Sequence, residues 1–97
     1  MNSTIGVRLR YYNVIRDAAG RSEDMLAVAP GTTLRGLLRD SVARKYPAVG
    51  DILFLQTGEL SPYTRFFRNG VVVEERSVDD PLEDGDEIRV FPAVAGG

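Results

Sequence analysis

One amphipathic helical pattern, over residues 34–46, lies between strand-like segments and constrains the fold more than any other feature of the chain. Thr32-Thr33 precedes it, and a threonine hydroxyl there can accept a hydrogen bond from a free amide of the first helical turn. Pro47 ends it, because the residue before a proline resists the helical region. The apolar positions recur at helical spacing, namely Leu34, Leu37, Leu38 and Val42, joined by Ser41 or Tyr46.

Alternation with a period of two on both sides of this helix predicts strands. Residues 5–12 place Ile5, Val7, Leu9 and Tyr11 on one face, and residues 23–28 form a second candidate strand. Asn69-Gly70 lies between residues 65–68 and 71–74, which is typical of a β-hairpin because both turn residues tolerate a positive φ. Asp84-Gly85-Asp86 predicts a further turn, and residues 87–91 predict the last strand.

The element order is strand, strand, helix, hairpin, strand, which predicts an α+β fold. In it, one main helix packs on one face of a mixed four- to five-stranded sheet. A chain of 97 residues forms one domain. We expect residues 1–91 to form that domain, with residues 52–55 as a short element at the edge of the core. The shapes of residues 13–21 and of the rest of 48–64 stay open.

Adjacent Phe66 and Phe67 point to opposite faces of the predicted hairpin strand. One ring is therefore expected in the core. The other is expected on the open face of the sheet, where it could form part of an interaction patch. The sequence does not say which ring is which, and ordinary packing is an alternative for either.

The absence of cysteine and histidine excludes several chemistries. Disulfides, thiolate metal sites and cysteine nucleophiles are impossible, and the commonest general base and transition-metal ligand are missing. Ser41 has no base to activate it and is interpreted as a helix-packing residue. No metal site or bound cofactor is expected.

Charge and hydropathy limit the partners. The net charge is −2 and the pI is about 5.0, so nucleic acid is not an expected partner. The charge is uneven: residues 1–50 have a net charge of +4 and residues 51–97 of −6. The chain has neither the ~18–20 continuous apolar residues of a membrane span nor the apolar core of a signal peptide. A cytoplasmic location without membrane contact is expected.

The last residues, Pro92-Ala93-Val94-Ala95-Gly96-Gly97, continue no strand or helix pattern. We expect residues 92–97 to form a flexible tail that reaches about 20 Å at ~3.3 Å per residue. Glycine has no Cβ, so Gly96 and Gly97 could enter a slot too narrow for other residues. The tail suits a partner's deep channel, and the expected contacts with a partner are Phe91, Pro92, Ala93, Val94 and Ala95.

Several segments together resemble the MoaD/ThiS family of sulfur carrier proteins. The C-terminal part of this resemblance is Asp84-Gly85-Asp86-Glu87, a hydrophobic strand and the Gly96-Gly97 ending. Residues 10–20 are similar to the family's first strand and loop, residues 31–38 to its helix start, Tyr46-Pro47 to its helix end and Asn69-Gly70 to its hairpin turn. The resemblance spans nearly the whole chain, is least clear over residues 48–64, and implies the ubiquitin-like β-grasp fold.

The resemblance also implies a mechanism centred on Gly97. In the family, an E1-like enzyme uses ATP and Mg²⁺ to adenylate the C-terminal carboxylate, and a sulfur donor converts it to a thiocarboxylate. A partner enzyme then takes the sulfur. The chain would be a co-substrate or a small subunit rather than a catalyst by itself. Gly97 would carry the reacting carboxylate, and neither it nor Gly96 would offer a side chain that blocks attack.

Within the family, the Phe91-Pro92-x-Val94-x-Gly96-Gly97 ending and the Arg16-Asp17-x-x-Gly20 loop resemble the molybdopterin synthase small subunit. The large subunit of that enzyme would then accept the sulfur. Ala93 replaces a second proline, which leaves open a carrier for cysteine, thiamin or another thio-metabolite. Two further alternatives are a ubiquitin-like modifier joined to lysines of other proteins and a plain β-grasp binding domain.

Two charge features add hypotheses. Residues 74–87 hold eight acids and one basic residue, Arg76. Asp84, Asp86 and Glu87 would steer this segment onto a basic rim of the partner, unless the acids simply solvate turns. Lys45 is the only lysine beside eleven arginines. Few lysines would limit self-acylation by an activated C-terminus, although an arginine-biased codon usage explains the same count.

Overall fold

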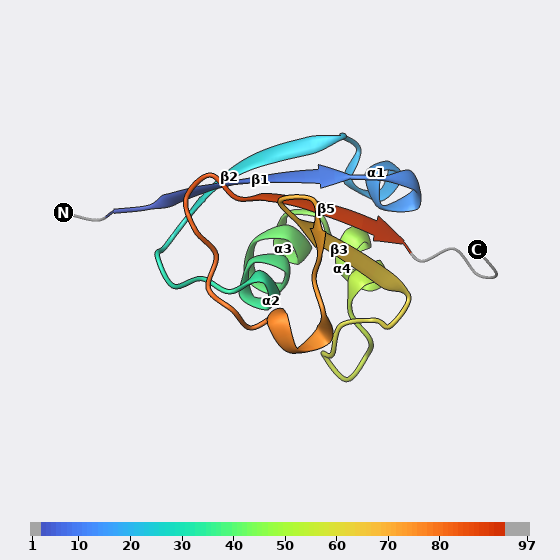
Figure 1. The fold of residues 1–97 in the computed structure, drawn as a ribbon. Coiled ribbons are helices and arrows are strands. Elements are labelled where there is room, and N and C mark those ends of the chain that lie inside the picture. The colour runs from blue at the N-terminus through green and yellow to red at the C-terminus, as the bar shows by residue number, and fades with distance from the viewer. Residues whose placement is uncertain (1–2, 93–97) are drawn as a thin grey trace.

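A mixed five-stranded sheet in the order β2-β1-β5-β3-β4 forms the frame of the computed structural model, which describes residues 3–92. Figure 1 shows the sheet with α2, α3 and α4 on one face. The two central strands, β1 and β5, run parallel, and the other neighbours are antiparallel. The predicted mixed sheet is confirmed. The strands are β1 (Ile5–Tyr11), β2 (Glu23–Val28), β3 (Thr64–Arg68), β4 (Val71–Val72) and β5 (Glu87–Pro92).

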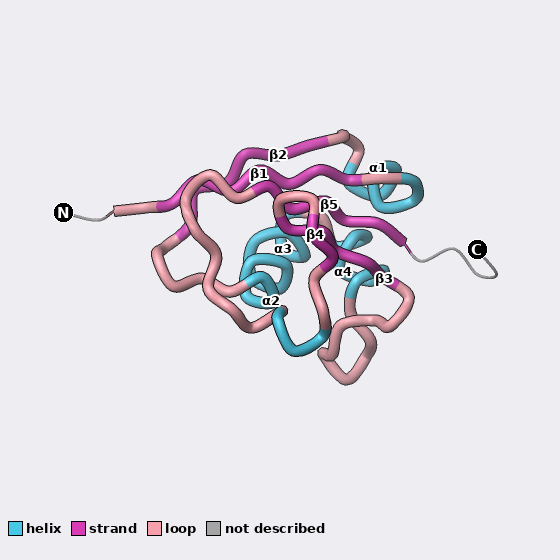
Figure 2. Tube along the Cα trace, in the orientation of Figure 1, coloured by secondary structure: helices cyan, strands magenta, loops and turns pink. Residues whose placement is uncertain are grey.

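The predicted main helix is confirmed as one continuous run of three parts, drawn in cyan in Figure 2. It consists of α2 (Leu34–Leu37), a π-helical turn η1 (Leu38–Val42) and α3 (Ala43–Lys45). The Thr33 hydroxyl accepts a hydrogen bond from the Gly36 amide at 3.0 Å, as the N-cap pattern predicts. All four predicted apolar positions, Leu34, Leu37, Leu38 and Val42, are buried. The amphipathic stripe therefore decides which helix face meets the sheet.

Two short helices occupy segments whose shape the sequence left open. Helix α1 (Asn13–Ala19) follows β1 and ends at Gly20, which has a φ of 74°. Helix α4 (Pro47–Leu53) starts at the proline that ends the main helix, and it buries Val49 and Leu53. The first half of the expected element at residues 52–55 is thus the end of α4, and Phe54 follows it in an isolated bridge with Leu60.

The predicted Asn69-Gly70 hairpin joins β3 to β4. Asn69 has a φ of 52° and Gly70 a φ of 84°, so both central residues take the left-handed conformation that this turn requires. The second hairpin strand is shorter than predicted, because only Val71 and Val72 form it. A short 3₁₀ helix, η2 (Glu75–Ser77), follows.

The core lies between the sheet and the helices. Alternate residues of β1, namely Val7, Leu9 and Tyr11, point into it, as the period of two predicts. Ile88 and Val90 of β5 are fully buried beside them. Within residues 3–92, no helix is both long and apolar enough to span a bilayer.

Candidate functional site

Strand β5 connects the domain to the predicted tail. It lies between β1 and β3. Its pairing with β1 ends at Val90, so Phe91 and Pro92 pair with β3 alone. Pro92, which we placed at the start of the tail, is the last residue of β5 and pairs with Thr64 of β3. Ala93, Val94, Ala95, Gly96 and Gly97 lie outside the described residues, so their expected roles stay predictions. The described part of the candidate site is therefore β5 and its surroundings.

Three aromatic rings form a cluster at the Pro92 end of β5, which we call the aromatic cluster. The Phe91 ring stacks on the Tyr12 ring, with centroids 4.2 Å apart and an interplanar angle of 10°. The Phe67 ring meets Phe91 edge-on, with centroids 5.4 Å apart and an angle of 80°. All three rings are half-buried, whereas Phe66 is 5% exposed and belongs to the core. Phe67 is therefore the ring on the open face of the sheet.

Two residues of the aromatic cluster are paired with arginines in the sheet. Arg65 of β3 is paired with Phe91 of β5, and Phe67 of β3 is paired with Arg89 of β5. The Arg65 guanidinium donates to the backbone carbonyls of Pro62 and Thr64, both at 2.9 Å, and within residues 3–92 no carboxylate lies in ion-pair range of it. Arg65, which is paired with Phe91 in the sheet, thus carries a charge that no described acid neutralises. Such a surface suits a partner with apolar and acidic groups.

The opposite end of β5 is organised by a buried carboxylate. Asp86 is 5% exposed and accepts hydrogen bonds from the Asn69 side-chain amide and the Glu83 backbone N–H, each at 2.8 Å. An Arg68 guanidinium nitrogen lies 2.8 Å from Asp86 Oδ2, the oxygen that also accepts the hydrogen bond from Glu83. These contacts tie the β3–β4 hairpin to the turn before β5. The Asp86 charge is therefore used inside the protein.

The other two predicted acidic contacts are nearer the surface. Asp84 is exposed, and its Oδ1 accepts a hydrogen bond from the Gly6 amide at 2.7 Å. Glu87 is half-buried, with its Oε1 2.9 Å from the Arg89 Nε. Glu87 and Pro92 begin and end the same strand, so about 16 Å separates them at ~3.3 Å per residue. The acidic turn thus lies far from the start of the tail, and its role in docking stays a prediction.

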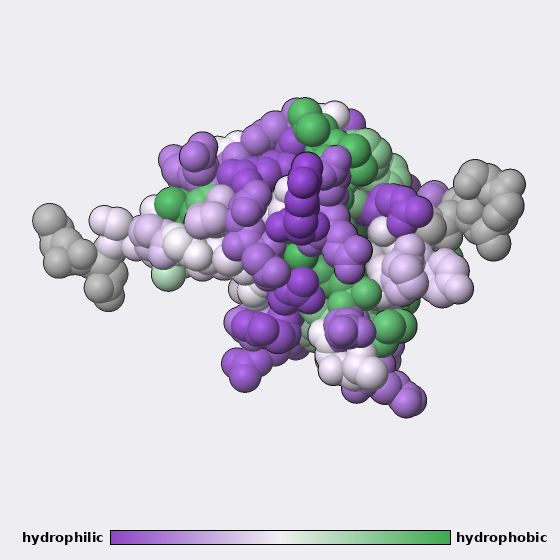
Figure 3. Space-filling view, turned by 60° about the horizontal axis from the view of Figure 1, so that its bottom comes forward, coloured by the Kyte–Doolittle hydropathy of each residue, from purple (hydrophilic) through white to green (hydrophobic). Residues whose placement is uncertain are grey.

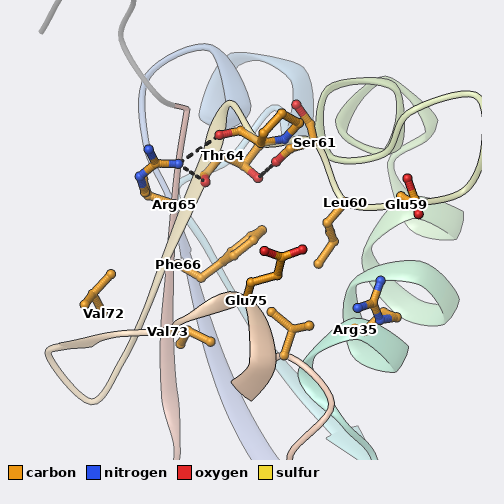
Figure 4. A pocket seen from close by; sticks show the side chains of 12 residues that line it. Arg35, Glu59, Leu60, Ser61, Thr64, Arg65, Phe66, Val72, Val73 and Glu75 are labelled. Carbon is orange, nitrogen blue, oxygen red and sulfur yellow. Dashed lines mark hydrogen bonds between the residues drawn. The ribbon is translucent and has the colours of Figure 1, made fainter.

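A pocket of about 490 Å³ lies along the edge of β3. Figure 3 shows apolar surface gathered between hydrophilic side chains on this side of the molecule. In Figure 4, Phe66, Leu60 and Val73 line the pocket, with Arg35, Glu59 and Glu75 around it. Arg35 is paired with Asp79 at 2.8 Å. The residues that line this pocket include no histidine, cysteine or lysine.

A second buried carboxylate, which the sequence analysis missed, lies between β2 and the main helix. Asp24 is 4% exposed and accepts hydrogen bonds from the Tyr11 hydroxyl at 2.8 Å and the Tyr46 hydroxyl at 2.7 Å. The Lys45 Nζ lies 3.2 Å from its other oxygen, and the Arg21 Nε 3.4 Å from that same oxygen. We call these five residues the Asp24 cluster. In the sequence, only the predicted position of Tyr11 on one face of the first strand, with Ile5, Val7 and Leu9, points to this cluster.

The pKa values of this cluster follow from its contacts. Burial alone would raise the pKa of Asp24, but hydrogen bonds from Tyr46, Tyr11 and Lys45 outweigh it and hold the pKa below its usual range. Burial and the hydrogen bond to Asp24 raise the pKa of Tyr11. The hydrogen bond to Asp24 also raises the pKa of Lys45. At neutral pH the cluster is an ionised carboxylate that holds two phenols and a protonated amine.

The described residues hold no group of three or more acidic side chains placed to bind a metal ion. The reactive carboxylate expected at Gly97 lies outside the described residues.

Comparison with known proteins gives consistent matches over most of the chain. The ThiS family model matches residues 9–97. Small archaeal modifier protein 3 of Haloferax volcanii is 32% identical over 92 residues, which cover 94% of this chain and 98% of that protein.

Solved structures give the same picture. The crystal structure of SAMP1 from Haloferax volcanii superposes with a TM-score of 0.83 at 25% identity, covering 95% of this chain and 99% of that one. A Pyrococcus furiosus protein described as a putative molybdopterin converting factor, subunit 1, gives a TM-score of 0.74 at 25% identity, covering 93% and 99%. With the observed sheet order, these likenesses confirm the ubiquitin-like β-grasp fold.

Proposed function

This chain belongs to the ThiS family of ubiquitin-like sulfur carriers and modifiers, and on that premise we propose that the Gly97 carboxylate is its reactive group. An E1-like enzyme adenylates this carboxylate with ATP and Mg²⁺. A sulfur donor then displaces AMP and leaves a thiocarboxylate, whose sulfur passes to an acceptor. The chain acts as a co-substrate or small subunit and binds no cofactor of its own.

The observation that carries the proposal is a family match that runs through the Gly96-Gly97 end of a domain with no histidine or cysteine. A terminal carboxyl group has a pKa of about 3.3–3.7, so it is anionic at neutral pH and resists nucleophilic attack. Adenylation supplies a leaving group and makes the carbonyl carbon electrophilic. The required acid, base and metal chemistry then belongs to the activating enzyme, and the sulfur must come from outside.

The aromatic cluster is the surface on which the activating enzyme docks in this proposal. Phe91 immediately precedes Pro92, so a partner that holds the Phe91 ring also fixes where the tail begins. Half-buried aromatic side chains and arginine are common anchors at protein interfaces. Arg65 adds a cation beside the rings, which favours an acidic rim on the enzyme.

For the acceptor, we propose molybdopterin synthesis, with the large subunit of molybdopterin synthase as the partner that takes the sulfur. The Phe91-Pro92-x-Val94-x-Gly96-Gly97 ending supports this choice, and so does the likeness to the Pyrococcus furiosus protein. A carrier for cysteine, thiamin or another thio-metabolite would share every step up to the thiocarboxylate.

A ubiquitin-like protein modifier is the second candidate. The observation that favours it is the 32% identity to Small archaeal modifier protein 3. It requires the same adenylation at Gly97 and differs only in the acceptor, which is a lysine of another protein. High-molecular-weight conjugates in cell extract that disappear when Gly97 is deleted would favour it over the sulfur carrier.

The first experiment is the intact mass of the chain purified from its native host. A thiocarboxylate makes the protein about 16 Da heavier, because sulfur replaces one oxygen. Since thiocarboxylates hydrolyse, the reaction is repeated with the E1-like enzyme, ATP, Mg²⁺ and sulfide. The Gly97 deletion is the control and should stay unmodified. If the full chain forms neither adenylate nor thiocarboxylate in that mixture, the proposal is wrong and the chain is a plain binding domain.

A further inference from the structure

The only lysine of the chain lies in the Asp24 cluster, at the end of the main helix. Its side chain is 46% exposed, so reagents can reach it. An activated carboxyl group of the kind proposed above reacts with amines, and the side-chain amine of Lys45 is the one that this sequence offers. What the structure does to that amine therefore matters to the proposed function.

Three features of the structure favour the charged form of this amine. The Nζ lies 3.2 Å from the ionised Asp24 carboxylate, which is itself fixed by the two tyrosine hydroxyls. The Nζ also lies 5.4 Å from the centre of the Tyr46 ring, whose negative face attracts a cation. Finally, Lys45 is the last residue of the helix, where the helix dipole favours positive charge. Arg21, near the same carboxylate oxygen, opposes these effects in part.

We propose that Asp24 is a specificity-determining residue, which withholds Lys45 from acylation and so reserves the activated C-terminus for its proper acceptor. The inference rests on the proposed activation of Gly97. The reaction that it prevents begins when a neutral lysine amine attacks the carbonyl carbon of the acyl adenylate. A C–N bond forms, the C–O bond to AMP breaks, and one proton leaves the nitrogen for water. A protonated amine has no lone pair for the first step.

Asp24 differs from the usual partner of a surface lysine, because it is buried. A carboxylate that is 4% exposed, with both oxygens occupied, cannot turn toward solvent without leaving the buried Tyr11 hydroxyl and the partly buried Tyr46 hydroxyl without their acceptor. The Asp24 carboxylate is thus fixed by its contacts in the protein, whereas the Lys45 side chain can move. The pair loses less to side-chain ordering than one between two exposed residues.

The test measures the reactivity of Lys45 without any activating enzyme. The full chain is treated with the N-hydroxysuccinimide ester of N-acetylglycine, an activated glycine carboxyl group, and acylation of Lys45 is followed by peptide mass spectrometry. The α-amino group of the same chain is the internal standard. We expect Lys45 of Asp24→Asn to react about two- to fivefold faster than in the wild type, the range that one partly exposed ion pair can supply.

Asp40→Asn is the matched control. It removes a carboxylate from the same helix, but one that pairs with Arg39 at 2.9 Å rather than with Lys45. Its Lys45 should react at the wild-type rate. Equal Lys45 rates in Asp24→Asn and the wild type, with both folded by circular dichroism, would overturn the inference. If the Lys45 acylation rate rises equally in Asp24→Asn and Asp40→Asn, the inference is overturned as well.

A measurement on the wild type covers the case in which Asp24→Asn does not fold. At the same pH, Lys45 should react about two- to fivefold more slowly than the amine of Nα-acetyl-lysine amide. An equal or faster rate would overturn the inference. These assays need no adenylation, so they separate the two proposals. If Lys45 is withheld but the activating mixture never modifies Gly97, the proposed function fails and the chemistry of the Asp24 cluster stands.

Discussion

The two ends of β5 hold their side chains in opposite ways. At the Glu87 end, Asp86 is buried, and every contact it makes is to another part of the same chain. At the Pro92 end, Phe91 is half-buried, and its ring packs on the half-buried rings of Tyr12 and Phe67. One strand thus combines an end fixed by internal polar contacts with an end that exposes apolar surface beside the tail.

This difference predicts that stability and partner recognition depend on opposite ends of the strand. A charge already paired inside the protein has little left to offer a partner, because binding would have to break its existing contacts. Half-buried aromatic rings lose little on binding and gain apolar contact area. Substitutions at the Asp86 end should therefore change folding, and substitutions at the Phe91 end should change association.

The largest expected effect is on stability, from Asp86→Ala. It leaves the Arg68 guanidinium, the Asn69 amide and the Glu83 N–H without their buried partner, so the free energy of unfolding should fall by about 3 kcal/mol. Asp84→Ala is the matched control in the same turn. It loses one exposed hydrogen bond to Gly6 and should cost about 1 kcal/mol or less. Urea unfolding measures both, and equal losses would erase the distinction between the two acids.

The next effect is on binding, from Phe91→Ala at the other end of the strand. Removing the central ring of the aromatic cluster should weaken binding to the activating enzyme by about 30-fold, in the range of an interface hot spot. Met25→Ala is the control, because Met25 is 66% exposed and is paired with Arg8 at the other edge of the sheet. Calorimetry with the purified enzyme gives both dissociation constants. Similar weakening by the two substitutions would show that docking is not centred on Phe91.

A smaller effect concerns pH, and it follows from the environment of Asp86. Burial alone would raise the pKa of Asp86, but hydrogen bonds from Glu83 and Asn69 and the Arg68 charge outweigh it and lower the pKa from its ordinary value of 3.8. A carboxylate with a lowered folded-state pKa stabilises the protein fully above the ordinary pKa, and this contribution disappears as the pH falls through the folded-state value.

Asp86→Asn tests this because asparagine keeps the shape and removes the titration. The wild type should be more stable than Asp86→Asn by about 1–2 kcal/mol at pH 7, and the gap should narrow below pH 3.8. Urea unfolding from pH 7 to pH 2.5 gives the curve. A gap that stays constant to the lowest pH would mean that the Asp86 charge contributes nothing to stability.

The sequence predicts the parts of this molecule whose signals are local. The apolar stripe and the Thr33 cap identify the main helix, and Asn69-Gly70 identifies the hairpin, because each signal lies within a few neighbouring residues. Helices α1 and α4 stay hidden, since seven residues provide only two buried positions each. That is too few for a period of 3.6 to be distinguished from chance.

In the candidate site, too, the sequence predicts local features and misses contacts between distant residues. Phe91 is predicted from its place before the tail, whereas its stacking on Tyr12 depends on the parallel pairing of β1 with β5, which joins residues about eighty positions apart. Asp86 cannot be distinguished from its acidic neighbours in the sequence. Its burial comes from Arg68 and Asn69 of the hairpin, which pack on it only after the sheet has formed.

The smallest expected effect concerns electrostatic steering by the two exposed acids at the fixed end of β5. Asp84→Lys with Glu87→Lys should slow association with the activating enzyme only about twofold. The turn lies about 16 Å from Pro92, and the screening length at physiological salt is about 8 Å. Arg65→Glu, beside the aromatic cluster, should slow it more, because Arg65 pairs with Phe91 in the sheet. Stopped-flow rates at low and high salt test both. If the lysine double variant slows association more than Arg65→Glu, the acidic turn meets the partner directly and recognition extends along the whole of β5.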